Sequence, residues 1–186
     1  MNTALVPGSL GAVSERNGSS LAEAFLNASV VCMIDVSSSM NAHDSRGGAS
    51  RYEVACTELA KLQANMPGKI AVVAFSDSVV FVPSGVPPFL GCGTDLERAL
   101  AFVKVADGTV RFVVISDGMP NDPAPCLNLA KTFKSRIDCL YAGPEDNRTG
   151  AHFLEQLAAA SHGKYAVTAQ AQQLAEQVQK MLQPGG

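Results

Sequence analysis

Three oxygen-bearing side chains stand at alternate positions just after a short apolar run at residues 30–34. They are Asp35, Ser37 and Ser39. The apolar run is bounded by polar residues and predicts a buried parallel strand, so Asp35 should lie at its carboxyl end. Open α/β sheets place their ligand sites at that edge. One carboxylate and two hydroxyls, without nitrogen or sulfur, suit a hard cation: Mg²⁺ first, with Ca²⁺ or Mn²⁺ as substitutes.

Two later loops carry donors of the same kind. Thr94 follows a glycine-flanked turn at residues 91–93, and Asp117 follows an apolar run at residues 112–115. Because neighbouring parallel strands end at one edge of a sheet, we expect the three loops to meet there. Two carboxylates and three hydroxyls suit a divalent cation. If the hydroxyls bind directly and the acids bind through water, the ion stays electron-poor and keeps an open position for an outside carboxylate.

Strand and helix patterns alternate along the chain and must position these loops. Apolar runs predict six strands, at residues 30–34, 70–75, 79–82, 111–116, 137–142 and 165–167. Apolar residues at helical spacing predict helices after Ser50, after Thr94, after Asp122, before Gly163 and over residues 174–182. The three-residue turn at 76–78 makes residues 79–82 the antiparallel hairpin partner of the preceding strand.

This alternation predicts an α/β fold of three layers. The sheet should be Rossmann-like, doubly wound and mostly parallel, with one short antiparallel edge strand and helices on both faces. Counted along the chain, the strand order should be 3-2-1-4-5-6. We assign residues 29–182 to the domain, residues 1–28 to a flexible N-terminal tail with a short helical turn at 20–27, and residues 183–186 to a C-terminal tail.

Composition excludes several functional classes. The chain has 186 residues, of which 47% are hydrophobic, so we expect one domain with a sizeable core. A net charge of -3 gives no electrostatic reason to bind nucleic acid or an anionic membrane. We find no secretory signal and no apolar run near the ~18 residues that span a bilayer. The five cysteines form no Cys-x-x-Cys pair, which favours a reduced, cytoplasmic setting.

Together, three motifs resemble the von Willebrand factor A (VWA) domain and its metal-ion-dependent adhesion site. They are Asp35-x-Ser37-x-Ser39, Gly93-Thr94-Asp95-Leu96 and Ser116-Asp117-Gly118-x-Pro120. The resemblance implies that Ser37, Ser39 and Thr94 contact the ion, while Asp35 and Asp117 act mostly through water. It also implies that the protein is no enzyme but a Mg²⁺-dependent interaction module, which docks a carboxylate of a partner protein on the ion.

The third motif is similar to those of compact intracellular VWA proteins, including prokaryotic and phage stand-alone members. For these proteins the resemblance implies partners such as an AAA+ ATPase or another product of the same gene cluster. That context is an analogy between folds and does not follow from the residues themselves.

Other interpretations of the same residues stay open from the sequence. Thr94 and Glu97 also form a capping box, so Thr94 could cap a helix instead of binding metal. Asp44 is predicted to be a solvated turn residue, and Asp122 is predicted to be a helix N-cap. A phosphohydrolase of the haloacid dehalogenase type also places an Asp after its first strand, but it needs an acid where Ser37 stands. A structural subunit with a vestigial metal site is the third alternative.

Overall fold

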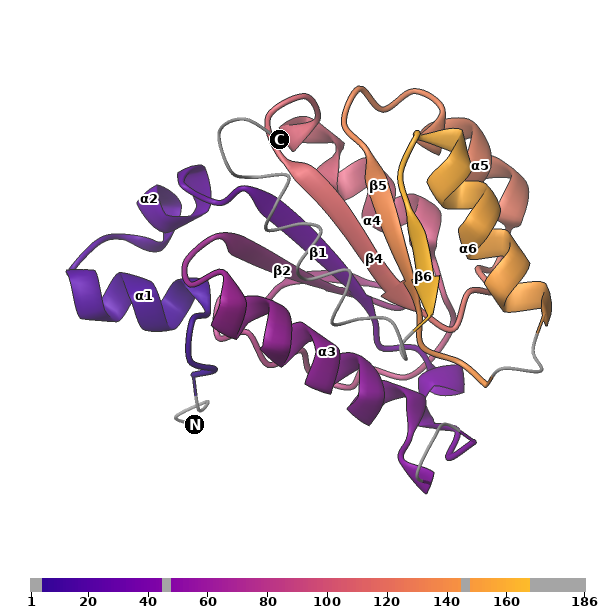
Figure 1. Ribbon diagram of the computed structural model, residues 1–186, viewed down its shortest axis with the longest axis horizontal. Helices are drawn as coiled ribbons and strands as arrows, with labels where there is room; N and C mark the ends of the chain where they lie inside the picture. The colour runs from indigo at the N-terminus through magenta and orange to yellow at the C-terminus, as the bar shows by residue number, and fades with distance from the viewer. Residues whose placement is uncertain (1–4, 45–47, 145–147, 168–186) are drawn as a thin grey trace.

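The computed structural model describes residues 5–44, 48–144 and 148–167 and contains a six-stranded sheet in the order β3-β2-β1-β4-β5-β6 (Figure 1). The strands are β1 (Val30–Asp35), β2 (Ile70–Phe75), β3 (Val79–Phe81), β4 (Arg111–Ser116), β5 (Ile137–Tyr141) and β6 (Tyr165–Val167). Neighbouring strands pair in parallel except β3, which is antiparallel to β2 at the edge. The predicted strand order, hairpin and fold class are confirmed.

Helices cover both faces of the sheet (Figure 1). One face packs on α3 (Arg51–Asn65), which begins at the predicted capping box of Ser50 and Glu53. The other packs on α4 (Leu96–Val103), α5 (Pro123–Ala130) and α6 (Arg148–Ala160), and η3 (Lys104–Ala106) extends α4. The helix predicted over residues 174–182 lies outside the described residues.

The central strand β1 is buried along its whole length because helices lie over both of its faces. Val31 and Met33 point into the core beneath α4, whereas Cys32 and Ile34 point into the core beneath α3. β1 pairs with β2 on one side and β4 on the other, in register from its first residue. This double burial explains the uninterrupted apolar run and fixes where Asp35 emerges.

The expected N-terminal tail is wrong over residues 10–17, which form a helix, whereas the short helical turn predicted at residues 20–27 is confirmed. The two helices are α1 (Leu10–Asn17), capped by Ser9, and α2 (Leu21–Leu26), capped by Ser20. Leu10 is only 1% exposed, and Gly11 N–H donates to the Pro83 carbonyl at 2.8 Å. A short, polar helix carries little periodicity, so tertiary contacts of this kind decide its structure.

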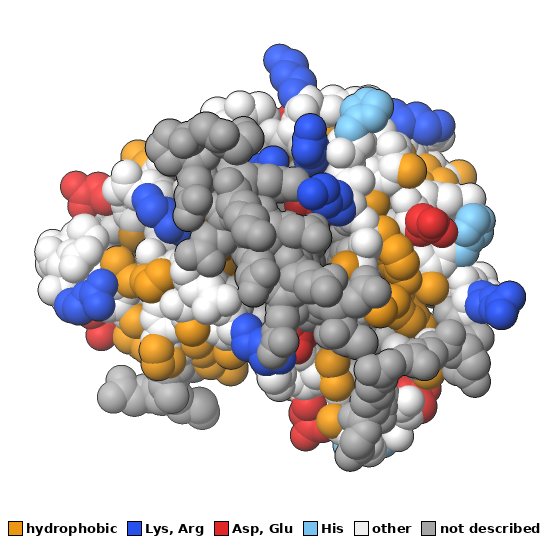
Figure 2. Space-filling model, in the orientation of Figure 1, with side chains coloured by type: hydrophobic (Ala, Val, Ile, Leu, Met, Phe, Trp, Pro, Cys, Tyr) orange, Lys and Arg blue, Asp and Glu red, His pale blue; other side chains and the backbone are white. Residues whose placement is uncertain are grey.

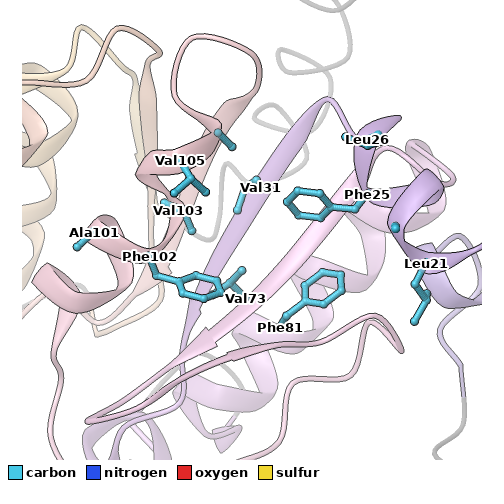
Figure 3. Close-up of a pocket in the computed structure, with 12 residues that line it drawn as sticks. Leu21, Phe25, Leu26, Val31, Val73, Phe81, Ala101, Phe102, Val103 and Val105 are labelled. Atoms are coloured by element: carbon cyan, nitrogen blue, oxygen red, sulfur yellow. The ribbon is translucent and has the colours of Figure 1, made fainter.

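An apolar groove of about 800 Å³ lies between α2 and the end of α4 (Figure 3). Phe25 and Phe102 stand on its two walls, and Val31 and Val73 form part of its floor. Val31 is near the start of β1, whereas Asp35 ends that strand. This apolar groove is therefore separate from the polar loops at the carboxyl edge.

The surface of the described residues carries charges of both signs, interspersed over the face in Figure 2. This distribution agrees with the small net charge of -3 and shows no broad basic region on that face. Every helix within the described ranges is too short or too polar to cross a membrane.

Candidate metal centre

The first loop is built around Asp35, which is fully buried at the end of β1. Its Oδ1 accepts a hydrogen bond from the Ser37 N–H at 2.9 Å, and its Oδ2 accepts one from the Ser116 hydroxyl at 2.6 Å. Ser116 ends the neighbouring strand β4. Two strands therefore fix the orientation of this carboxylate, as predicted for the carboxyl edge of a parallel sheet.

Ser37 and Ser39 present their hydroxyls side by side, with the two Oγ atoms 3.1 Å apart. Ser37 precedes the short helix η1 (Ser38–Asn41) but makes no side-chain cap with it. Its hydroxyl is thus not used by the helix backbone. Beneath the loop, Met40 is completely buried and anchors it in the core.

Thr94 lies buried between the second and third loops and does not cap α4. The N-cap is Asp95, whose side chain accepts from the Arg98 N–H at 2.9 Å, so the capping-box alternative for Thr94 is wrong. The backbone of Thr94 exchanges two hydrogen bonds with Asn121. Thr94 N–H donates to Asn121 Oδ1 at 3.0 Å, and Asn121 N–H donates to the Thr94 carbonyl at 2.9 Å.

Asp117 follows β4 and is only 2% exposed. Its Oδ2 accepts from Arg51 Nη1 at 2.6 Å, while its Oδ1 is buried without a hydrogen-bond partner among the described residues. An unpartnered buried carboxylate oxygen is costly unless something positive reaches it. A bound cation or a water molecule would satisfy this atom.

Hydrogen bonds join the three loops to each other. Ser38 N–H donates to the Cys92 carbonyl at 3.0 Å, and Gly91 N–H donates to the Val36 carbonyl at 2.9 Å. The Asn121 bonds join the second loop to the third, and the Ser116 bond to Asp35 joins the third to the first. The predicted meeting of the loops is therefore observed, although the coordination of an ion by them stays a prediction.

Electrostatics at this centre favour a bound cation. The pKa of Asp35 is raised to about 6, mainly by burial and to a smaller extent by the negative charge of Asp117, while the hydrogen bonds from Ser116 and Ser37 oppose that rise. No group of three or more His, Cys, Asp or Glu side chains able to hold a metal occurs among the described residues. A cation here would therefore depend on hydroxyl oxygens as well as acids. Two buried acids, three hydroxyl-bearing residues and an unpartnered oxygen fit a divalent ion.

A role in the site is not predicted from the sequence for three residues that contact candidate ligands: Arg51, Ser116 and Asn121. Ser116 belongs to the third motif, and its position at a strand end, directly before Asp117, could have indicated a role in the site. Arg51 and Asn121 reach partners 66 and 27 positions away, which local patterns do not reveal. Asp44 is exposed to solvent, as expected, but it is also bound by Arg51 Nε and Nη2. Asp122 caps α5 as predicted.

Asn121 offers a test of how Thr94 is positioned. We expect Asn121→Ala to weaken Mg²⁺ binding about tenfold, because groups that orient a ligand are worth about 10–100-fold in affinity. Asp122→Ala is the matched control: it removes the neighbouring cap of α5, lowering stability by about 1 kcal/mol without changing Mg²⁺ affinity. Calorimetric titration of both variants measures this, and equal affinities would show that Asn121 does not act through Thr94.

Solved structures of other proteins share this architecture, although the sequence matches no family model and no curated protein. An aerotolerance-related membrane protein from Bacteroides fragilis is 20% identical, with a TM-score of 0.65 over 83% of this chain and 100% of that chain. The von Willebrand factor domain of the type V pilus tip protein Mfa5 from Porphyromonas gingivalis is 15% identical, with a TM-score of 0.61 over 84% of this chain and 96% of that one.

A manganese-loaded TRAP protein from Plasmodium vivax is also similar. It is 15% identical, with a TM-score of 0.58 over 82% of this chain and 74% of that chain. Identities this low establish the fold and nothing finer. The chain therefore has a VWA-like fold, as the three sequence motifs predict.

Proposed function

We propose that this protein is a Mg²⁺-dependent protein-interaction module. In this proposal Ser37, Ser39 and Thr94 hold the cation, and Asp35 and Asp117 support it through water. Ca²⁺ or Mn²⁺ would serve as substitutes. The observation that carries the proposal is the unpartnered Oδ1 of Asp117, buried where the three hydrogen-bonded loops meet. The manganese-loaded protein of similar fold supports a divalent ion in such a scaffold.

The bound cation would supply an electrophilic position for a carboxylate of another protein. The chain's own residues give this position its surroundings. Asp35 and Asp117 are buried, so their charges act through a poorly screened medium. Phe89, Leu90 and Met119, beside the second and third loops, are exposed apolar side chains that offer contact area to a partner.

Turnover of a phosphorylated substrate is less consistent with this site. The phosphohydrolase alternative requires a proton-transferring acid two residues after Asp35, and Ser37 stands there with its hydroxyl beside that of Ser39. A vestigial site fits poorly because the hydrogen bonds that orient Asp35 and Thr94 are all in place. We therefore propose a binding protein without enzymatic activity.

The proposal extends to the kind of partner, the residues that select it and the location of the protein. The expected sources of specificity flank the candidate ligands in sequence: residues 43–48, of which 45–47 lie outside the described residues, and residues 91–93 and 119–122. An AAA+ ATPase or another product of the same gene cluster is the proposed kind of partner. A cytoplasmic location is also proposed, supported by five free cysteines, all within the described ranges and three of them buried.

The proposal is tested by capturing partners on the immobilised protein in Mg²⁺ and in chelator. For an identified partner, affinity should fall at least about thirtyfold when the chelator is present or when the partner's docking Asp or Glu is changed to its amide. The control is a second acid of the partner outside the interface. Equal affinity in all three conditions would show that the metal is not the docking point.

A further inference from the structure

Arg51 lies between two acids at the edge of the candidate metal centre. It is the first residue of α3, and its N–H donates to the Ala42 carbonyl at 3.1 Å. Its guanidinium donates from Nη1 to Asp117 Oδ2 at 2.6 Å, and from Nε and Nη2 to both oxygens of Asp44 at 2.8 and 2.5 Å. The Arg51 side chain is 12% exposed, so its charge is largely shielded from solvent.

The contact with Asp117 determines which oxygen that carboxylate can offer. Oδ2 is already held by a charged donor, and such hydrogen bonds are about twice as strong as neutral ones. Oδ1, buried and without a described partner, is left as the oxygen that can face a cation or its water. Asp117 can therefore contribute one oxygen while Arg51 keeps the other.

The guanidinium also changes the charge that a cation meets. Asp35 and Asp117 would neutralise a divalent ion by themselves. Arg51 adds a positive charge in contact with Asp117, whereas Asp44, which shares that charge, is 43% exposed and partly screened by water. The formal charges of the ion, Arg51 and the three acids cancel, but because Asp44 is the solvent-screened acid, the potential at the ion is more positive than Asp35 and Asp117 alone would leave it. This favours an incoming carboxylate but opposes the ion itself.

We infer that Arg51 is a positioning residue of the metal centre, which presents Asp117 through a single oxygen and limits Mg²⁺ affinity by acting as a built-in competing cation. This inference rests on the proposed metal site and extends it. A purely structural Arg51 would only secure the start of α3 to the preceding loop. That role would affect the melting temperature but would not tighten Mg²⁺ binding when the residue is removed.

Calorimetric titration of the full chain with Mg²⁺ alone tests the inference in three variants. Arg51→Gln should bind Mg²⁺ about tenfold more tightly than the wild type, because a competing charge is gone. Arg51→Lys keeps a positive charge near Asp117 and should stay within about threefold of the wild type. Asp44→Asn should bind about twofold more weakly, because it leaves the Arg51 charge to Asp117 alone.

The opposite signs of Arg51→Gln and Asp44→Asn are the decisive result. Unchanged or weaker Mg²⁺ binding by folded Arg51→Gln protein would overturn the inference while leaving the proposed function standing. If Arg51→Gln does not fold, an Asp44→Asn variant that binds as tightly as the wild type, or more tightly, overturns it instead. A wild type that binds no Mg²⁺ would refute the proposed function and the inference with it.

Discussion

Asp35→Asn should lower the affinity for Mg²⁺ by about a hundredfold or more while preserving the fold. The amide keeps an oxygen for the Ser37 N–H, and its NH₂ group can donate to the Ser116 hydroxyl in place of the bond that Oδ2 now accepts. Only the charge is lost. The measurement is the rise in melting temperature on adding Mg²⁺, which the wild type should show and the variant should lack.

Stability without metal separates loss of the ion from loss of structure. Burial raises the pKa of Asp35 to about 6, so above that pH the folded protein carries a buried charge that the unfolded chain hydrates more easily. At pH 7 in chelator, Asp35→Asn should therefore be at least as stable as the wild type. Asp138→Asn, at an equally buried aspartate of β5 outside the three loops, is the control that should keep the Mg²⁺ response. A full response in Asp35→Asn would refute the site.

Gly118→Ala should destabilise the protein by about 4 kcal/mol, because two independent penalties coincide there. Gly118 has a φ of +95°, which an L side chain rarely adopts, and a Cβ would lie 2.1 Å from the Gly150 carbonyl oxygen. The obstacle is backbone at the start of α6, which cannot move aside cheaply. Because Gly118 follows Asp117 directly, the variant should also lose Mg²⁺ affinity.

Gly18→Ala provides the matched comparison for the steric part of this effect. Gly18 has a φ of +64° at the end of α1, but nothing lies within 4 Å of an added Cβ. Only the conformational penalty remains, about 1 kcal/mol. Denaturant unfolding in chelator measures both variants. A Gly118→Ala protein no less stable than Gly18→Ala would contradict the observed packing of the third loop against α6.

The sequence predicts those parts of the fold that local patterns encode. Residues 30–34 are apolar on both faces because helices cover both faces of β1. Asp35 is predicted as a site residue because it directly follows this apolar run, at the carboxyl end of the strand. The same reasoning places Asp117 after β4. Hydroxyls at alternate positions in the first loop complete the set, so the candidate ligands can be named without coordinates.

Contacts between distant segments are what the sequence does not reveal. Arg51 reaches Asp117 only because α3 packs over β1 and starts beside the carboxyl edge. Asn121 supports Thr94 only because the third loop folds back on the second. Residues 10–17 are helical because Leu10 finds a buried place and the backbone bonds to the loop at Pro83. Each depends on tertiary packing, which overrides weak local propensity.

The central claim is that one divalent cation binds where the three loops meet. The most direct measurement is an anomalous difference map from crystals grown with MnCl₂, in which Mn²⁺ substitutes for Mg²⁺ and marks its own position. We predict a single peak in contact with the hydroxyls of Ser37, Ser39 and Thr94, with Asp35 and Asp117 behind it. A map with no peak among these residues, or with its only peak elsewhere on the protein, would contradict the account.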